Sequence, residues 1–135
     1  TAVQKAAAAD NSISNTIISK AKPNLGIRYR SGGKSPKTGF DCSGFTSYVY
    51  KNTVCSIERV AQAQFDTTTR VSRDELLPGD LVFFGSSAYS ISHVGIYVGD
   101  GQFIHAPHTG DVVKYDSLSG SYATRFQGGG RVIFD

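Results

Sequence analysis

The 135-residue chain contains no tryptophan, no methionine and only two cysteines, which allow at most one disulfide. Its apolar stretches are far shorter than the roughly 20 residues of a membrane helix, so we expect no membrane span. No basic run accompanies the formal net charge of +3, so we expect solvated surface and no nucleic-acid partner. Thr1 begins no recognisable export signal, so an exported form would have lost its signal.

Fifteen glycines and 39% hydrophobic residues in a chain of this length are typical of one globular domain. Residues 1–10 are rich in alanine and are predicted to be a linker or an N-terminal extension. Residues 11–135 then form the single domain, and we expect a monomer.

Apolar spacing predicts a helix that begins near Asn11 and is stopped by Pro23, and a second helix from Cys42 to about Tyr50. Strand composition is found in residues 81–84 and in "HVGIYVG", "QFIHA" and "RVIFD". The "GDG" between "HVGIYVG" and "QFIHA" predicts a hairpin turn. Helices followed by consecutive antiparallel strands predict an α+β fold.

Cys42 is predicted to lie in the first turn of the second helix, where the helix dipole and unpaired N–H groups favour a thiolate. We therefore expect a thiol pKa below the roughly 8.5 of free cysteine. Gly44 is predicted to leave room for a substrate backbone, and the first helical amides are candidates for an oxyanion hole. A disulfide to Cys55 is disfavoured because the far helix end lies roughly 12 Å away. We interpret Cys55 as a small buried residue.

The chain offers three histidines as a base for this thiol. If the turn at residues 99–101 is tight, His93 and His105 stand nearly opposite each other on paired strands. One ring nitrogen of His93 would then face Cys42 while His105 holds the other, as a base and its orienter. We interpret His108, in the loop "APHTG", as a surface or groove-lining residue. A zinc site is disfavoured because CxxC and HExxH spacings are missing, so neither metal nor other cofactor is expected.

The stretches "GFDCSGFTSYVY", "LLPGDLVFF" and "SHVGIYVGDGQFIHAPHTG" occur in an order that resembles the NlpC/P60 family of papain-like cysteine peptidases, which remodel bacterial cell walls. The resemblance runs from about Tyr29 to the C-terminus. It implies N-terminal helices packed on a central antiparallel sheet, with Cys42 as nucleophile, His93 as general base and His105 as the polar third residue. It also implies hydrolysis of the bond between the side-chain carboxyl of D-glutamate and a diamino acid, through a thioester.

The same resemblance implies residues that bind substrate. Tyr29 matches a tyrosine near the oxyanion site, and Asp41 and Ser43 match residues of a pocket for the substrate amine. The family's "Leu-Pro-Arg-x-Ser-x-x-Gln" is "IERVAQAQ" here, with Arg59 and Gln64 retained. The family's "Tyr-x-Trp-Gly-Gly" is "YRSGG", so the shape and polarity of the groove are expected to differ from the common type.

The resemblance implies an exported protein of the cell envelope, the periplasm or the medium, with peptidoglycan or muropeptides as its substrate. Two alternatives stay open. A Cys-His arrangement also supports amidase or acyltransferase chemistry, because water or another nucleophile can resolve a thioester. The other alternative is a catalytically silent wall-binding module, against which the intact Cys42, His93 and His105 argue.

Overall fold

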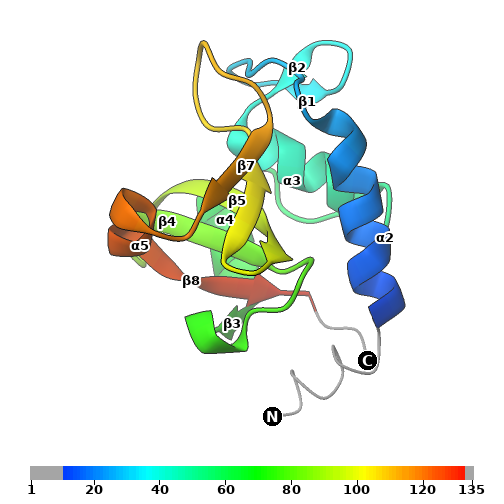
Figure 1. Cartoon of the computed structure of the whole chain (residues 1–135). Coiled ribbons are helices and arrows are strands. Elements are labelled where there is room, and N and C mark those ends of the chain that lie inside the picture. Colours follow the sequence, from blue (N-terminus) through cyan, green and yellow to red (C-terminus); the bar gives the residue numbers. More distant parts are fainter. Residues whose placement is uncertain (1–10, 133–135) are drawn as a thin grey trace.

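The computed structural model describes residues 11–132, in which helices pack against a six-stranded sheet (Figure 1). The helices are α2 (Asn11–Ala21), α3 (Cys42–Lys51), α4 (Ala61–Thr67) and α5 (Gly120–Arg125), with 3₁₀ turns η1 (Lys22–Asn24) and η2 (Arg73–Glu75). The strands are β1 (Lys34–Ser35), β2 (Gly39–Phe40), β3 (Thr69–Val71), β4 (Leu81–Ser87), β5 (Ser90–Gly99), β6 (Gln102–His105), β7 (Lys114–Ser117) and β8 (Phe126–Arg131). These elements confirm the predicted α+β class.

The sheet has the strand order β3-β8-β4-β5-β6-β7, and each neighbouring pair is antiparallel. From β4 to β7 the strands follow the chain order, as consecutive hairpins require. The last strand, β8, returns to lie between β3 and β4. β1 and β2 pair with each other outside this sheet, and α2 and α3 lie side by side (Figure 1).

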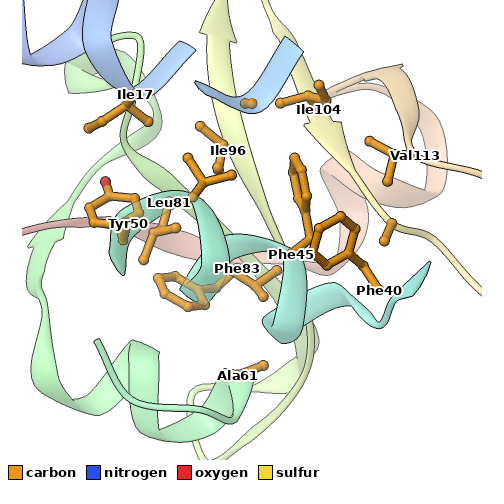
Figure 2. Packing of buried hydrophobic residues seen from close by; sticks show 14 of the residues in the cluster. Ile17, Phe40, Phe45, Tyr50, Ala61, Leu81, Phe83, Ile96, Ile104 and Val113 are labelled. Carbon is orange, nitrogen blue, oxygen red and sulfur yellow. The ribbon is translucent and has the colours of Figure 1, made fainter. Parts of the chain in front are cut away.

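Alternate residues of β4 are buried on opposite faces of the sheet. Leu81 and Phe83 belong to the larger core cluster, which also holds buried residues of α2 and α3 (Figure 2). Val82 and Phe84 belong to a smaller cluster on the other face, together with Phe103 of β6. Because both faces of the sheet are covered here, residues 81–84 of β4 are all apolar and their side chains are fully buried.

α3 begins at a side-chain cap. Asp41 has an extended backbone, and its Oδ1 accepts the backbone N–H of Gly44 at 2.6 Å. Phe45 and Val49, one turn apart, are fully buried in the larger cluster. The predicted helix is confirmed, and the cap makes Cys42 its first residue.

A tight turn joins β5 to β6, as predicted. Asp100 and Gly101 both have positive φ angles, 54° and 74°, as a type I′ turn requires. A bulge between Tyr97 and Gly99 interrupts the pairing next to this turn. The bulge shifts by one residue the pairing of β5 with β6 at Tyr97 and at the residues before it.

Of the strand predicted over "RVIFD", residues 133–135 lie outside the described residues, and the strand that the structure describes here, β8, begins five residues earlier, at Phe126, and ends at Arg131. Three consecutive glycines, residues 128–130, have low strand propensity and hid this strand. Close packing explains them: a Cβ at Gly129 would lie 2.6 Å from the Leu76 side chain, and one at Gly130 2.3 Å from the Thr68 hydroxyl.

Two other predictions concern the whole chain. The linker predicted at residues 1–10 lies outside the described residues. Among residues 11–132, no helix has both the length and the apolar content to cross a membrane.

Candidate active site

Cys42 lies at the junction of α3 and β5. Its thiol is partly buried against the larger cluster and receives hydrogen bonds from the backbone of Val94 and of Ser43. The thiol is therefore next to the β5 backbone, one residue along the strand from His93. Both Cys42 and Cys55 are free thiols.

The predicted lowering of the thiol pKa is wrong. Burial, followed by the negative charge of Asp41, raises the pKa of Cys42, and the hydrogen bonds from Val94 and Ser43 only partly oppose this rise. Burial, followed by the neighbouring His105, lowers the pKa of His93 to about 3. At neutral pH the site therefore holds a neutral thiol and a neutral imidazole.

His93 and His105 are hydrogen-bonded through their rings, with Nε2 of His93 2.7 Å from Nδ1 of His105. Their strands pair with Ile96 opposite Ile104, so Gly95 rather than His93 comes opposite His105. The two rings therefore meet diagonally across the strands instead of directly. Within residues 11–132, Nδ1 of His93 has no hydrogen-bond partner, and the side chain retains a small exposed fraction of 8%.

Asp116 of β7 extends this pair, and sequence reasoning missed it. Its Oδ2 lies 2.7 Å from Nε2 of His105, so a continuous chain of contacts runs from His93 through His105 to the carboxylate. β7 pairs with β6 so that Asp116 stands opposite Phe103, two residues from His105. In the sequence, the only indication of β7 was the alternation of charged residues, Lys114 and Asp116, with their neighbours, and this stretch is too short to predict a strand.

Aromatic rings enclose the two histidines on the face of the smaller cluster. The ring of Phe84 lies 5.8 Å from that of His93, and the ring of Phe103 lies 4.5 Å from that of His105. Tyr122 of α5 meets His105 edge-on at 5.6 Å. These contacts limit rotation of the imidazoles and keep water away from His105, which is fully buried.

Three of the predicted substrate-binding residues form one polar network beside Cys42. Nη1 and Nη2 of Arg59 donate to Oδ1 and Oδ2 of Asp41 at 3.1 Å and 3.0 Å, and Nη1 also donates to the Ser43 hydroxyl at 3.0 Å. The backbone N–H of Gly32 donates to Oδ2 of Asp41 at 3.1 Å. The Asp41 carboxylate is therefore already paired with a cation of its own chain.

Tyr29 lies near both the thiol and this network. Burial raises the pKa of Tyr29, and the charges of Cys42 and Asp41 raise it further. Its backbone N–H donates to the carbonyl of Asp111 at 2.8 Å, which ties the loop before β1 to the loop before β7. A role for Tyr29 at the oxyanion stays a prediction.

The open space expected at Gly44 is not there. A Cβ at Gly44 would lie 1.9 Å from the carbonyl oxygen of Gly33 and 2.8 Å from Oδ1 of Asp41. The glycine lets α3 pack against the preceding loop, and the chain's own backbone occupies the room assigned to substrate.

Gln64 is fully buried and fully engaged within the chain. Its Nε2 donates to the carbonyls of Glu58 and Ser43 at 2.8 Å and 3.2 Å, and its Oε1 accepts from Thr46 at 2.8 Å. These bonds tie α4 to the first turn of α3. Substrate contact by Gln64 stays a prediction, whereas its contact with Ser43 gives it a part in positioning the network.

His108 lies apart from this chain of contacts. Its side chain is 71% exposed, and its nitrogens contact the carbonyl of Thr109 and the carboxylate of Asp111. Within the described part of the chain, no three His, Cys, Asp or Glu side chains are grouped so as to hold a metal ion.

Residues 26–131 match the sequence profile of the NlpC/P60 family, and this range includes every residue of the site. The chain belongs to the NlpC/P60 family. Three curated relatives illustrate the activities that similar proteins carry. The chain is 51% identical over 105 residues to a probable endopeptidase p60 of Listeria seeligeri, 42% over 120 residues to murein DD-endopeptidase MepH of Escherichia coli, and 38% over 119 residues to a gamma-DL-glutamyl hydrolase of Bacillus subtilis.

These alignments cover 78%, 86% and 86% of this chain but only 19%, 44% and 29% of the relatives. The chain therefore spans less than half the length of each curated relative. Among solved structures, the NlpC/P60 domain of the peptidoglycan hydrolase SagA superimposes with a TM-score of 0.79 at 36% identity. That superposition covers 88% of this chain and 98% of the SagA domain, so the shared unit is the NlpC/P60 domain itself.

Proposed function

We propose that the chain is the catalytic domain of a cysteine endopeptidase that cleaves the γ-D-glutamyl–diamino acid bond of peptidoglycan stem peptides and acts in the cell envelope. The observation that carries the proposal is the position of Cys42, at the first turn of α3 and beside the strand that bears His93. The names of the relatives, which include a murein endopeptidase and a gamma-DL-glutamyl hydrolase, support the class of substrate.

In the proposed reaction, His93 takes the thiol proton of Cys42 while the sulfur attacks the γ-carbonyl carbon of D-glutamate. The backbone N–H of Cys42, the first residue of α3, stabilises the oxyanion. The C–N bond then breaks, and the His93 imidazolium returns its proton to the departing amine of the diamino acid. A thioester between Cys42 and the γ-glutamyl group remains.

Water resolves the thioester. His93 removes a proton from the water, whose oxygen attacks the thioester carbonyl, and the C–S bond breaks. The γ-carboxyl group of D-glutamate leaves, and the proton on His93 returns to the Cys42 sulfur. The neutral thiol and neutral imidazole of the resting site are thereby restored, in agreement with the raised pKa of Cys42 and the lowered pKa of His93.

Mass spectrometry of digested muropeptides tests both the activity and the bond. Disaccharide-linked and free tri- and tetrapeptides, with crosslinked dimers, are incubated with the wild type, Cys42→Ala and Cys55→Ala. We expect L-Ala-D-Glu fragments from the wild type and from Cys55→Ala, and none from Cys42→Ala. Uncrosslinked products with intact stems would instead assign a DD-endopeptidase, and substantial hydrolysis by Cys42→Ala would exclude Cys42 as the nucleophile.

The proposed amine pocket makes a separate prediction about substrate. Because Arg59 already neutralises Asp41, a substrate ammonium gains little Coulomb energy there. We therefore expect its hydrogen bond to Asp41 to contribute a free energy at the low end of the range for charge-assisted hydrogen bonds. Peptides with a free L-alanine amine should then be favoured about tenfold in kcat/KM over N-acetylated ones, which corresponds to ~1.4 kcal/mol. Asp41→Asn should reduce that ratio. Equal rates on both peptides with the wild type would indicate intact peptidoglycan as the substrate.

A further inference from the structure

We propose that Asp116 is a positioning residue that fixes the tautomers of both histidines and so leaves Nδ1 of His93 free to accept the thiol proton of Cys42. The inference rests on the proposed roles of Cys42 and His93. It adds a fourth member, on a different strand, to a site otherwise described by three residues.

The first step is the contact between Asp116 and His105. A carboxylate accepts hydrogen bonds and cannot donate them. Oδ2 of Asp116 lies 2.7 Å from Nε2 of His105, so the shared proton belongs to the histidine nitrogen. A neutral imidazole carries one ring proton, and Nδ1 of His105 is therefore bare.

The second step passes this constraint to His93. The bare Nδ1 of His105 can only accept, and Nε2 of His93 stands 2.7 Å from it. The proton of that contact must lie on Nε2 of His93. Neutral His93 then has a lone pair on Nδ1, the nitrogen that has no partner within residues 11–132. Asp116 thereby selects the nitrogen that accepts the thiol proton, although two hydrogen bonds separate Asp116 from His93.

The opposite arrangement is disfavoured by burial. If each proton moved to the other ring nitrogen, a lone pair of His105 would face the carboxylate of Asp116 at 2.7 Å. His105 is fully buried, so water cannot compensate for the lost donor. In that arrangement His93 would also carry its proton on Nδ1 and could not act as the base.

Other charged groups act on the pair through space. Lys114 and Asp111 act on His105, and Arg125 and His108 act on His93. Burial lowers the pKa of His105, while its hydrogen bond to Asp116 raises it. Within the described residues, however, only Asp116 is hydrogen-bonded to the outer nitrogen of His105, so only Asp116 can select a tautomer there.

A direct test is ¹⁵N NMR of the imidazole nitrogens at neutral pH, in a His108→Gln background that leaves two histidine signals to assign. We expect both rings as the Nε2–H tautomer in the otherwise unchanged protein. In Asp116→Asn the amide can donate as well as accept, so we expect the Nδ1–H tautomer to appear in both rings. A wild-type His93 protonated on Nδ1, or tautomers unchanged by Asp116→Asn, would overturn the proposal.

Kinetics provide the second test. Asp116→Asn should lower kcat/KM on a muropeptide with little change in KM, by about 10-fold to 100-fold if the loss is of the order found when the outer partner of a metal-bound histidine is removed. Asp116→Glu, which keeps a carboxylate, should recover part of this loss. The matched control is Asp100→Asn, which removes the same charge from an exposed turn where asparagine tolerates the positive φ. A wild-type kcat in Asp116→Asn would contradict the assignment.

The two tests separate this proposal from the proposed function. If Cys42→Ala still hydrolysed peptidoglycan, the function would fail, but the tautomer spectra would stand. If Asp116→Asn did not fold, as judged by circular dichroism, the wild-type spectrum and Asp116→Glu would still decide the matter.

Discussion

Burial acts on the two proposed reacting groups in opposite senses. It raises the pKa of the Cys42 thiol and lowers the pKa of His93 to about 3, because removal from water disfavours the charged form of each. A preformed thiolate–imidazolium pair is therefore not the resting state. The proposed mechanism depends instead on a proton acceptor that is already in the correct tautomer.

The two histidines should differ in the cost of their loss. His93→Ala removes the base and should lower kcat about 10²-fold to 10⁴-fold. His105→Gln leaves the base in place but less well held, so about 10-fold to 100-fold is expected. Steady-state rates on a purified muropeptide measure both. His108→Ala, whose side chain is exposed, is the control and should change KM at most; a loss as large as that of His93→Ala would show that the third residue is misassigned.

The lowered pKa of His93 also predicts a pH-dependent stability. The unfolded histidine has a pKa near 6.5 and the folded one about 3, so below pH 6.5 the unfolded state binds more protons. The contribution of His93 to the free energy of unfolding is complete above pH 6.5 and falls as the pH drops toward 3, by up to about 1.4 kcal/mol per pH unit.

Urea unfolding between about pH 7 and pH 4 measures this slope. The wild type should lose more stability over that interval than His93→Gln, which has no such proton to bind. Parallel losses in the two proteins would mean that His93 titrates normally in the folded state.

At the scale of elements, α3 is held by the close approach of its first turn to the loop before it. The Gly33 carbonyl occupies the place of a side chain at Gly44, and Asp41 caps the helix from the same side. The helix start, the cap and the Arg59 network are thus one packed unit.

Gly44→Ala should therefore disrupt this unit. Its Cβ would overlap backbone rather than a movable side chain, so we expect a loss of about 3 kcal/mol or more in the free energy of unfolding, at the upper end for overpacking. Ser47→Ala, on the same helix and half-buried, should change stability by only about 1 kcal/mol through its lost bond to Gly44. Thermal and urea unfolding compare the two, and similar values would show that the loop yields easily.

At the scale of the whole molecule, a buried ion pair links the end of β8 to the start of β4, its antiparallel neighbour, across 51 positions of the sequence. Nη2 of Arg131, the last residue of β8, donates to Oδ2 of Asp80 at 2.6 Å, just before β4. Both side chains are at most 7% exposed. Asp80 also accepts the backbone N–H of Leu77 at 2.8 Å, so one carboxylate holds both the turn and the returning strand.

Removing one partner of this pair should be costly. Arg131→Leu leaves the Asp80 carboxylate buried without its cation, and about 3–5 kcal/mol of unfolding free energy should be lost. Arg30→Leu, at an exposed position, should stay within about 0.5 kcal/mol of the wild type. Urea unfolding of both variants at neutral pH is the measurement, and a loss below 1 kcal/mol for Arg131→Leu would show that Asp80 finds another partner.

Local spacing by itself determined α2, α3, the strands β4 to β6 and the turn at Asp100 and Gly101. Each of these follows from residues a few positions apart: apolar periodicity, a capping aspartate, or a glycine in a tight turn. The proximity of His93 and His105 was also predictable, because a hairpin brings its two strands together whatever the rest of the chain does.

The tertiary structure decided what depends on distant neighbours. β8 is a strand despite its three glycines because it pairs with β3 on one side and β4 on the other, and Leu76 and Thr68 leave no room for side chains at Gly129 and Gly130. Asp116 meets His105 only because β7 pairs with β6 in one register. The pKa of the Cys42 thiol is raised chiefly by burial, and burial is a property of the packed molecule. The place of Cys42 at the start of a helix is a local property, and the spacing of nearby residues was enough to predict it.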